Sequence, residues 1–150
     1  MLDLAKDLLK EGGAKVRLPA DVVIANGVDE NAETKIMPVG PVPDGWRVLD
    51  IGPQTVADFG KVIQSAKTVV WNGSMGMYEL PVFWIGTFGI AQAVAESHAI
   101  GIVGGGNSVE AIQESGLAYK ITHISTGGGA SLEMLEGATL PGVVALQEKA

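Results

Sequence analysis

Two triplets of consecutive glycines constrain this chain more than any other feature of its sequence. The glycines at 104–106 follow an apolar run at 99–103, and those at 127–129 follow a predicted strand at 121–125. A helical pattern starts directly after each triplet. Three glycines let a backbone approach an anion without an intervening Cβ, and a helix N-terminus adds free N–H donors and the positive end of its dipole. Each turn therefore predicts an anion site.

The two turns are expected at the same edge of one sheet. Their strands are close in sequence and read as parallel, and parallel α/β sheets bind ligands at the carboxyl edge. One glycine triplet can simply make a tight turn, whereas two on one edge favour phosphate binding. Neither turn matches the P-loop, which needs Gly-Lys-Ser/Thr, or the spaced G-x-G-x-x-G of dinucleotide folds.

Apolar runs and helical periods alternate along the 150 residues. Strands are predicted at 16–19, 22–25, 35–37, 47–51, 67–71, 99–103 and 121–125. Helices are predicted behind a cap at Asp3 to residue 12, from Pro53 to about 66, from a cap at Thr87 to 96, from 107 or 108 to 115, and from 126–129 to 137. The alternation is typical of parallel strands covered by helices. The predicted fold class is therefore α/β, a three-layer, mainly parallel sheet of the Rossmann-like doubly wound type.

Charge and composition exclude several function classes. Ten basic residues against seventeen acidic ones give a net charge of −7, which argues against nucleic acid as a partner. The chain has no cysteine, which excludes a disulfide scaffold and a thiol nucleophile. No run resembles a signal peptide or a membrane span, so we expect a cytoplasmic protein without a membrane partner.

A third strand end carries chemistry at 71–79, where Asn72 and a glycine turn precede Glu79. The carboxylate can accept hydrogen bonds from ribose hydroxyls. Taken alone, Glu79 is better explained as a solvated loop acid. His98 and His123 have no second histidine or acid at ligand or dyad spacing, so neither is expected to be catalytic.

Through these motifs the chain resembles the phosphoglycerate kinase family. The resemblance rests on the sequences at 70–73, 104–106, 123–133, 135–137 and 140–142. It covers essentially the whole chain, but only part of the family's C-terminal, nucleotide-binding lobe. The N-terminal lobe and the opening strands with their nucleotide-contacting lysine have no counterpart. Residues 1–150 are therefore expected to form a single partial domain.

The resemblance implies glycolytic phosphoryl transfer between 1,3-bisphosphoglycerate and ADP, with Mg²⁺ and ATP or ADP bound. It also implies roles for individual positions. Glu79 would hold the ribose, and Val48 and Leu49 would border the adenine. The rest of the nucleotide set is Asn72, Gly104, Gly105, Gly106, Asn107 and Ser108. The amides of Gly127, Gly128 and Gly129 would steady the transferred phosphoryl group, because that reaction needs positioned donors more than it needs a base.

Some positions depart from the family. Asn107 stands where the family usually has the aspartate expected near magnesium, so no metal ligand is assigned with certainty. Ser74 replaces a proline, and residues 85–87 read Ile-Gly-Thr where Lys-Gly-Thr is common. Lys15 aligns with a later strand than the family's catalytic lysine segment and is given no catalytic role.

Two functional interpretations stay open. One is part of a phosphoglycerate kinase, inactive by itself. The other is a stand-alone or engineered fragment that binds nucleotide, or only folds, without catalysis. The absent strands are expected to leave an open sheet edge at 16–19 or 67–71, covered by the missing N-terminal lobe or by another copy of the chain.

Overall fold

A three-stranded parallel sheet lies at the centre of the fold. The computed structural model describes residues 2–146. Strands β4 (Thr68–Asn72), β5 (Ile100–Gly104) and β6 (His123–Ser125) pair in the order β4-β5-β6. Their registers, Thr68 to Ile100 and Ile102 to His123, bring all three carboxyl ends to one edge. The expected α/β class is confirmed.

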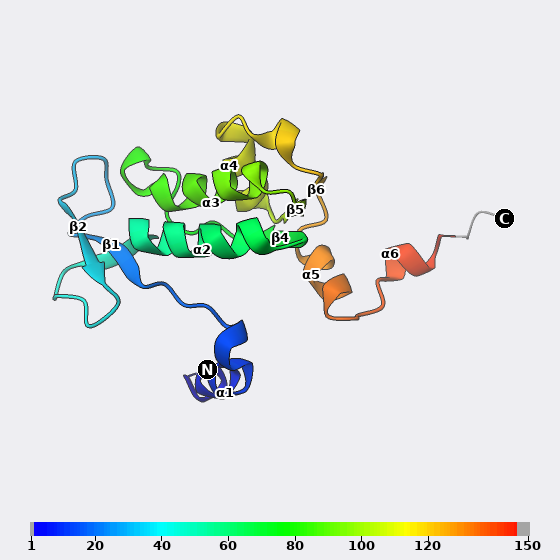
Figure 1. Cartoon of the computed structure of the whole chain (residues 1–150), viewed down its shortest axis with the longest axis horizontal. Coiled ribbons are helices and arrows are strands. Elements are labelled where there is room, and N and C mark those ends of the chain that lie inside the picture. The colour runs from blue at the N-terminus through cyan, green and yellow to red at the C-terminus, as the bar shows by residue number, and fades with distance from the viewer. Residues whose placement is uncertain (1, 147–150) are drawn as a thin grey trace.

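Helices cover one face of this sheet. They are α2 (Pro53–Ser65), α3 (Ile85–Glu96) and α4 (Gly106–Glu114), and Figure 1 shows α2 and α3 running side by side. Each crossover between parallel strands contains a helix, as parallel pairing requires. The core beneath these helices includes the buried residues Trp71, Ile90, Val94, Val103 and Ile112.

A second, antiparallel sheet was not anticipated from the sequence. Strand β1 (Asp21–Ala25) lies between β2 (Thr34–Pro38) and β3 (Arg47–Ile51) and pairs antiparallel with both. The predicted strands are present, but the connections between them contain no helix, so the chain can only turn back on itself. Helix α2 then carries the chain from β3 to the parallel sheet.

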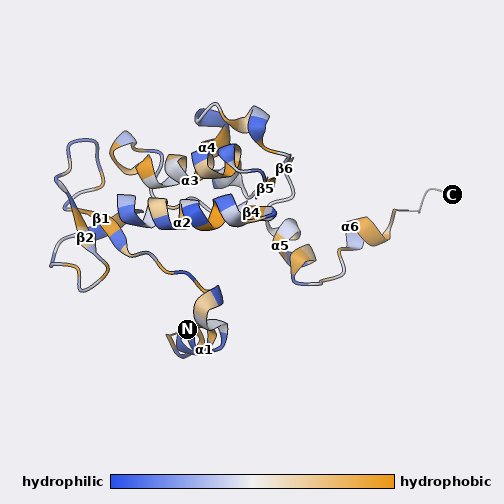
Figure 2. Ribbon diagram, viewed as in Figure 1, coloured by the Kyte–Doolittle hydropathy of each residue, from blue (hydrophilic) through white to orange (hydrophobic). Residues whose placement is uncertain are grey.

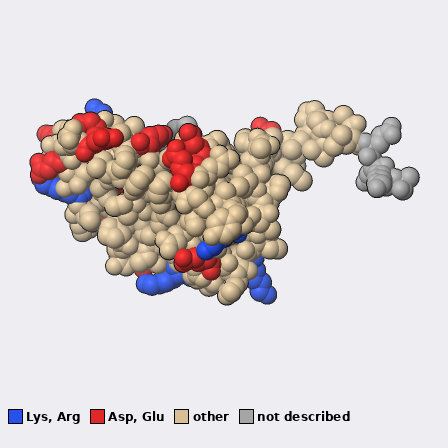
Figure 3. Space-filling model, turned by 90° about the horizontal axis from the view of Figure 1, so that it is seen from above, with Lys and Arg blue, Asp and Glu red and all other residues tan. Residues whose placement is uncertain are grey.

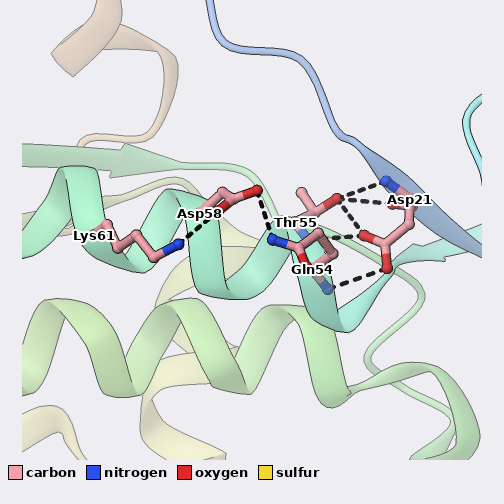
Figure 4. Close-up of polar contacts among 5 residues, drawn as sticks. All are labelled: Asp21, Gln54, Thr55, Asp58 and Lys61. Carbon is pink, nitrogen blue, oxygen red and sulfur yellow. Dashed lines mark hydrogen bonds and ion pairs between the residues drawn. The ribbon is translucent and has the colours of Figure 1, made fainter.

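One acid of this small sheet anchors α2 (Figure 4). The Asp21 carboxylate accepts hydrogen bonds from the backbone N–H of Gln54 (3.1 Å) and of Thr55 (2.7 Å) and from the Thr55 hydroxyl (2.6 Å). Burial alone would raise the pKa of Asp21, but these hydrogen bonds outweigh it and the pKa is lowered. Asp21 therefore caps α2 from a distant strand.

Three local expectations are wrong. No strand forms at 16–19, because pairing of β1 begins at Asp21 opposite Pro38, which leaves the preceding segment without a partner strand. Thr87 and Asp3 are not caps. Helices α3 and α1 (Leu2–Gly12) already include them, and the buried Thr87 hydroxyl instead accepts the N–H groups of Met75 and Gly76.

The ends of the chain pack little against the rest. Helices α1, α5 (Gly129–Leu135) and α6 (Pro141–Val144) have no buried residue, and Figure 2 shows apolar residues on all three. Short 3-10 turns, η1 (Gly13–Lys15), η2 (Pro81–Phe83) and η3 (Ala118–Lys120), complete the described elements. Within residues 2–146, no helix is both long and apolar enough to cross a membrane.

Candidate functional site

The first glycine turn leads from β5 into α4. Gly105 has φ +86°, and a Cβ there would lie 2.9 Å from Asn72 Oδ1, so both the backbone angle and the close approach require glycine. The first helical hydrogen bond runs from Val109 N–H to Gly105 O (3.0 Å). The N–H groups of residues 106–108 precede it and are the orphan donors of a helix start. They border a hollow of about 170 Å³ that Asn72 also lines.

The second glycine turn leads from β6 into α5. Ser125 Oγ lies 2.6 Å from Ser131 Oγ and accepts the N–H of Gly127 at 3.2 Å. Of the three amides expected to face a transferred phosphoryl group, that of Gly127 is therefore engaged within the turn. Gly128 has φ +50°, and neither it nor Gly129 has a neighbour within 4 Å of an added Cβ.

The two turns border one hollow of about 380 Å³. Gly105, Gly106, Val109, Glu110 and Gln113 line it from one side, and Ser125, Thr126 and Gly128 line it from the other. The register explains this juxtaposition, because Gly104 is paired with Ser125 at the ends of neighbouring parallel strands. The shared sheet edge expected from the sequence is thus present.

The segment after β4 joins this edge through backbone hydrogen bonds. Gly73 N–H donates to Ser108 Oγ at 2.6 Å, which uses the hydroxyl of the fully buried Ser108 inside the protein. Met77 N–H donates to Leu49 O at 2.9 Å and so ties β3 to the segment that carries Glu79. Glu79 itself is exposed. Leu49 is thus bonded to the Glu79 segment, and its half-exposed neighbour Val48 precedes it in β3.

A buried acid beneath this segment was missed in the sequence. Asp50 is 2% exposed and accepts the N–H of Gly86 at 2.7 Å and of Ile51 at 2.8 Å. Burial raises the pKa of Asp50 to about 6 despite these two hydrogen bonds, which act to lower it. The sequence signal for Asp50 is its place between the apolar residues Leu49 and Ile51, because an acid in such a position often has an internal hydrogen-bonding role.

A second missed contact joins the Glu79 segment to α4. Tyr78 is 3% exposed, and its hydroxyl donates to Glu110 Oε2 at 2.9 Å. Burial, followed by this hydrogen bond and the charge of Glu110, raises the pKa of Tyr78 to about 12. The two residues are 32 positions apart, so no local sequence pattern signals the pair.

The site draws little on charged side chains. Figure 3 shows several groups of Asp and Glu on the face it views and only separated Lys and Arg. Attraction for an anion must then come mainly from the N–H groups at the helix starts. Among residues 2–146, no group of three or more His, Cys, Asp or Glu is arranged to hold a metal.

Fold and site together define an α/β protein with two glycine turns that line one hollow at the carboxyl edge of a parallel sheet. The sequence matches the family model of phosphoglycerate kinase over residues 1–138. The chain belongs to the phosphoglycerate kinase family.

Individual relatives agree with this assignment. A phosphoglycerate kinase of Herpetosiphon aurantiacus is 56% identical over 137 residues, covering 91% of this chain and 35% of the relative. A cytosolic phosphoglycerate kinase of Triticum aestivum is 50% identical, over 98% of this chain and 38% of the relative. The solved phosphoglycerate kinase of Coxiella burnetii superimposes with a TM-score of 0.89 at 38% identity, covering 95% of this chain and 38% of that one. The chain thus spans little more than a third of the relatives it matches.

Proposed function

We propose that this chain is the nucleotide-binding part of a phosphoglycerate kinase, folded as a single partial domain, and that it binds ADP and ATP with Mg²⁺. The observation that carries the proposal is the hollow shared by the two glycine turns, with the Glu79 segment anchored at the same sheet edge. This arrangement offers donors for a phosphate chain and, beside them, an acceptor for a ribose.

The roles of the residues follow from the chemistry of the groups they present. The N–H groups of 105–108 hold the nucleotide phosphates, while the exposed Glu79 accepts the ribose hydroxyls. Val48 and Leu49 border the adenine. The amides of Gly128 and Gly129, joined by that of Gly127 once it gives up its bond to Ser125, steady the phosphoryl group as it moves between 1,3-bisphosphoglycerate and ADP. Magnesium, held by the phosphates with the amide oxygen of Asn107, would supply charge neutralisation when bound.

The proposal is tested by calorimetric titration of the chain with ADP in the presence of Mg²⁺. We expect weak binding, because the chain covers only part of its relatives. Glu79→Gln should weaken it, and Glu30→Gln, in the distant loop before β2, serves as the matched control. No heat at millimolar ADP would contradict nucleotide binding.

The partner at the sheet is the remaining part of a longer kinase or a second copy of this chain. Strand β4 is an edge strand, and Val70 (44% exposed) lies on the face opposite α2 and α3. A hollow of about 360 Å³ on this face is lined mainly by apolar side chains, including Ile102, Leu132 and Leu135. Sedimentation at micromolar concentration tests the second copy: a monomer at every concentration would exclude it.

The cytoplasm is the location proposed for this chain. The relative from Triticum aestivum is named cytosolic, although that from Volvox carteri is named chloroplastic. Fractionation of cells that express the chain checks this, and recovery with an organelle would contradict it.

A further inference from the structure

The segment that carries Glu79 is fixed mainly through its backbone. Gly73 is bonded to Ser108, Met77 is bonded to Leu49, and the N–H groups of Met75 and Gly76 share the hydroxyl of Thr87. These bonds hold the segment against the strand end, against β3 and against α3. Next to Glu79, the N–H of Leu80 donates to Met77 O at 3.1 Å, which closes the local turn but does not tie it to α4.

Tyr78 supplies the contact next to Glu79. Its side chain is buried while Glu79 is exposed, so the two neighbours point into different surroundings. The Tyr78 hydroxyl reaches Glu110 at 2.9 Å, and Glu110 belongs to α4, the helix whose first turn borders the phosphate hollow. A tyrosine has few rotatable bonds, so it transmits position from one element to the other with little freedom.

We propose that the hydrogen bond from Tyr78 to Glu110 is a positioning clamp that sets the distance between the ribose acceptor Glu79 and the phosphate-binding turn 104–108. The clamp rests on the proposed nucleotide function. Tyr78 is buried, and the Glu110 carboxylate at the side of the hollow is engaged by the Tyr78 hydroxyl. The two residues fix the relation between two elements that are 32 residues apart in the chain.

The clamp favours ligands that use both elements at once. A nucleoside diphosphate must place its ribose and its phosphates in one fixed geometry, and a preorganised site avoids the ordering cost at the moment of binding. A ligand that touches only one element gains nothing from a fixed distance. Adenosine reports on the Glu79 end alone, and inorganic pyrophosphate reports on the glycine turns alone.

Calorimetric titration of the chain and of Tyr78→Phe with ADP, adenosine and pyrophosphate tests the clamp. Tyr78→Phe keeps the buried ring and removes only the hydroxyl. We expect its Kd for ADP to rise about tenfold, the effect of one hydrogen bond to a charged acceptor. The Kd values for adenosine and pyrophosphate should change less than about twofold. Tyr119→Phe, at an exposed tyrosine, is the matched control.

A second variant keeps the test independent of folding defects. Glu110 is exposed, so Glu110→Ala should leave the fold intact, with Glu114→Ala on the same helix as its control. The double variant Tyr78→Phe, Glu110→Ala should bind ADP no worse than either single variant, because both remove the same bond.

The outcomes separate the clamp from the proposed function. If the unaltered chain does not bind ADP, the proposed function fails and the clamp fails with it. If the chain binds ADP but Tyr78→Phe binds it equally well, only the clamp is overturned. Equal weakening of ADP, adenosine and pyrophosphate, or additive effects in the double variant, would show a general structural role and would also overturn the clamp.

Discussion

The two glycine turns have nearly the same sequence pattern but differ in how they are held. The turn at 104–108 follows the central strand β5, and α4 behind it buries Ser108, Ala111 and Ile112. The turn at 125–129 follows the edge strand β6, and α5 behind it buries no residue. A glycine triplet therefore allows a backbone to approach an anion, but the neighbouring packing decides whether the turn is already rigid.

Contacts from other segments also support the first turn more than the second. Three residues at or just after the end of β4 contact the first turn or its helix. They are Asn72, Gly73 and Tyr78, the last through Glu110 of α4. The second turn is held by the bonds of Ser125 to Ser131 and to Gly127, which lie within the turn itself. Nucleotide binding should therefore depend on the first turn, whereas transfer chemistry at the second needs support from outside this chain.

The largest expected effect concerns transfer itself. The chain alone should show no phosphoglycerate kinase turnover, because it spans little more than a third of its relatives and its second turn is weakly packed, so we expect the second substrate to be positioned by the remainder of such a kinase. Lost positioning can forfeit about 7–11 kcal/mol of the barrier. A coupled assay with this chain as the only protein checks this. Normal turnover would show that the second turn is complete as it stands.

Alanine substitutions in the two turns should give unequal losses. Gly105→Ala imposes a positive φ on alanine and pushes its Cβ against Asn72, so we expect a loss of about 2–3 kcal/mol in the free energy of unfolding, together with weaker ADP binding. Gly128→Ala also imposes a positive φ, but it meets no neighbour and lies beside a helix without buried residues. Its cost should stay below about 1 kcal/mol, since the turn can relax. Urea unfolding compares the two, and equal losses would remove the distinction between the turns.

Much of the fold could be predicted because its signals are local. The strands around Trp71 and Val103 are apolar runs that end in asparagine and glycine, the strand around Ile124 ends just before the second glycine triplet, and Pro53 does begin α2. The direction of pairing at Val22 and Val48 could not be predicted in this way. An apolar run fits a parallel or an antiparallel partner, and only the connection decides between them.

The candidate site likewise has parts that local sequence patterns signal and parts that depend on distant contacts. The turns and Glu79 are sequence-local motifs and could be singled out without coordinates. Asp50 and the Tyr78–Glu110 pair act through contacts with residues more than 30 positions away, so their importance depends on packing that no short pattern encodes. Sequence therefore indicates the groups that we propose to face a ligand, and the structure adds the groups that hold them in place.

A pH effect should act beneath the Glu79 segment through Asp50. Its folded pKa, about 6, lies above the ordinary value of 3.8, so the folded state takes up this proton first and is stabilised as the pH falls from 7 towards 5. The stability of the unaltered chain minus that of Asp50→Asn should therefore increase by about 1–2 kcal/mol over this range. Urea unfolding at pH 7, 6 and 5 measures it.

Asp58→Asn is the control for this pH effect. Asp58 is hydrogen-bonded by Gln54 and Lys61, which lower its pKa below 3.8, so it stays ionised between pH 7 and 5. Its difference from the unaltered chain should be flat over this range. A flat difference for Asp50→Asn as well would show that Asp50 is already neutral or is well solvated.

The smallest expected effect concerns the response of the first turn to magnesium. Asn107→Asp places a carboxylate at the start of α4, where a hard cation bridging phosphates prefers charged oxygen to an amide. We expect ADP to bind roughly three- to tenfold more tightly than to the unaltered chain when Mg²⁺ is present. Without Mg²⁺ it should bind less tightly, because the new charge repels the phosphates. Gln92→Glu, on α3 and away from both turns, controls for net charge. Calorimetric titration with ADP, with and without Mg²⁺, checks both expected results. Equal affinities for Asn107→Asp and the unaltered chain under both conditions would show that residue 107 does not face the metal.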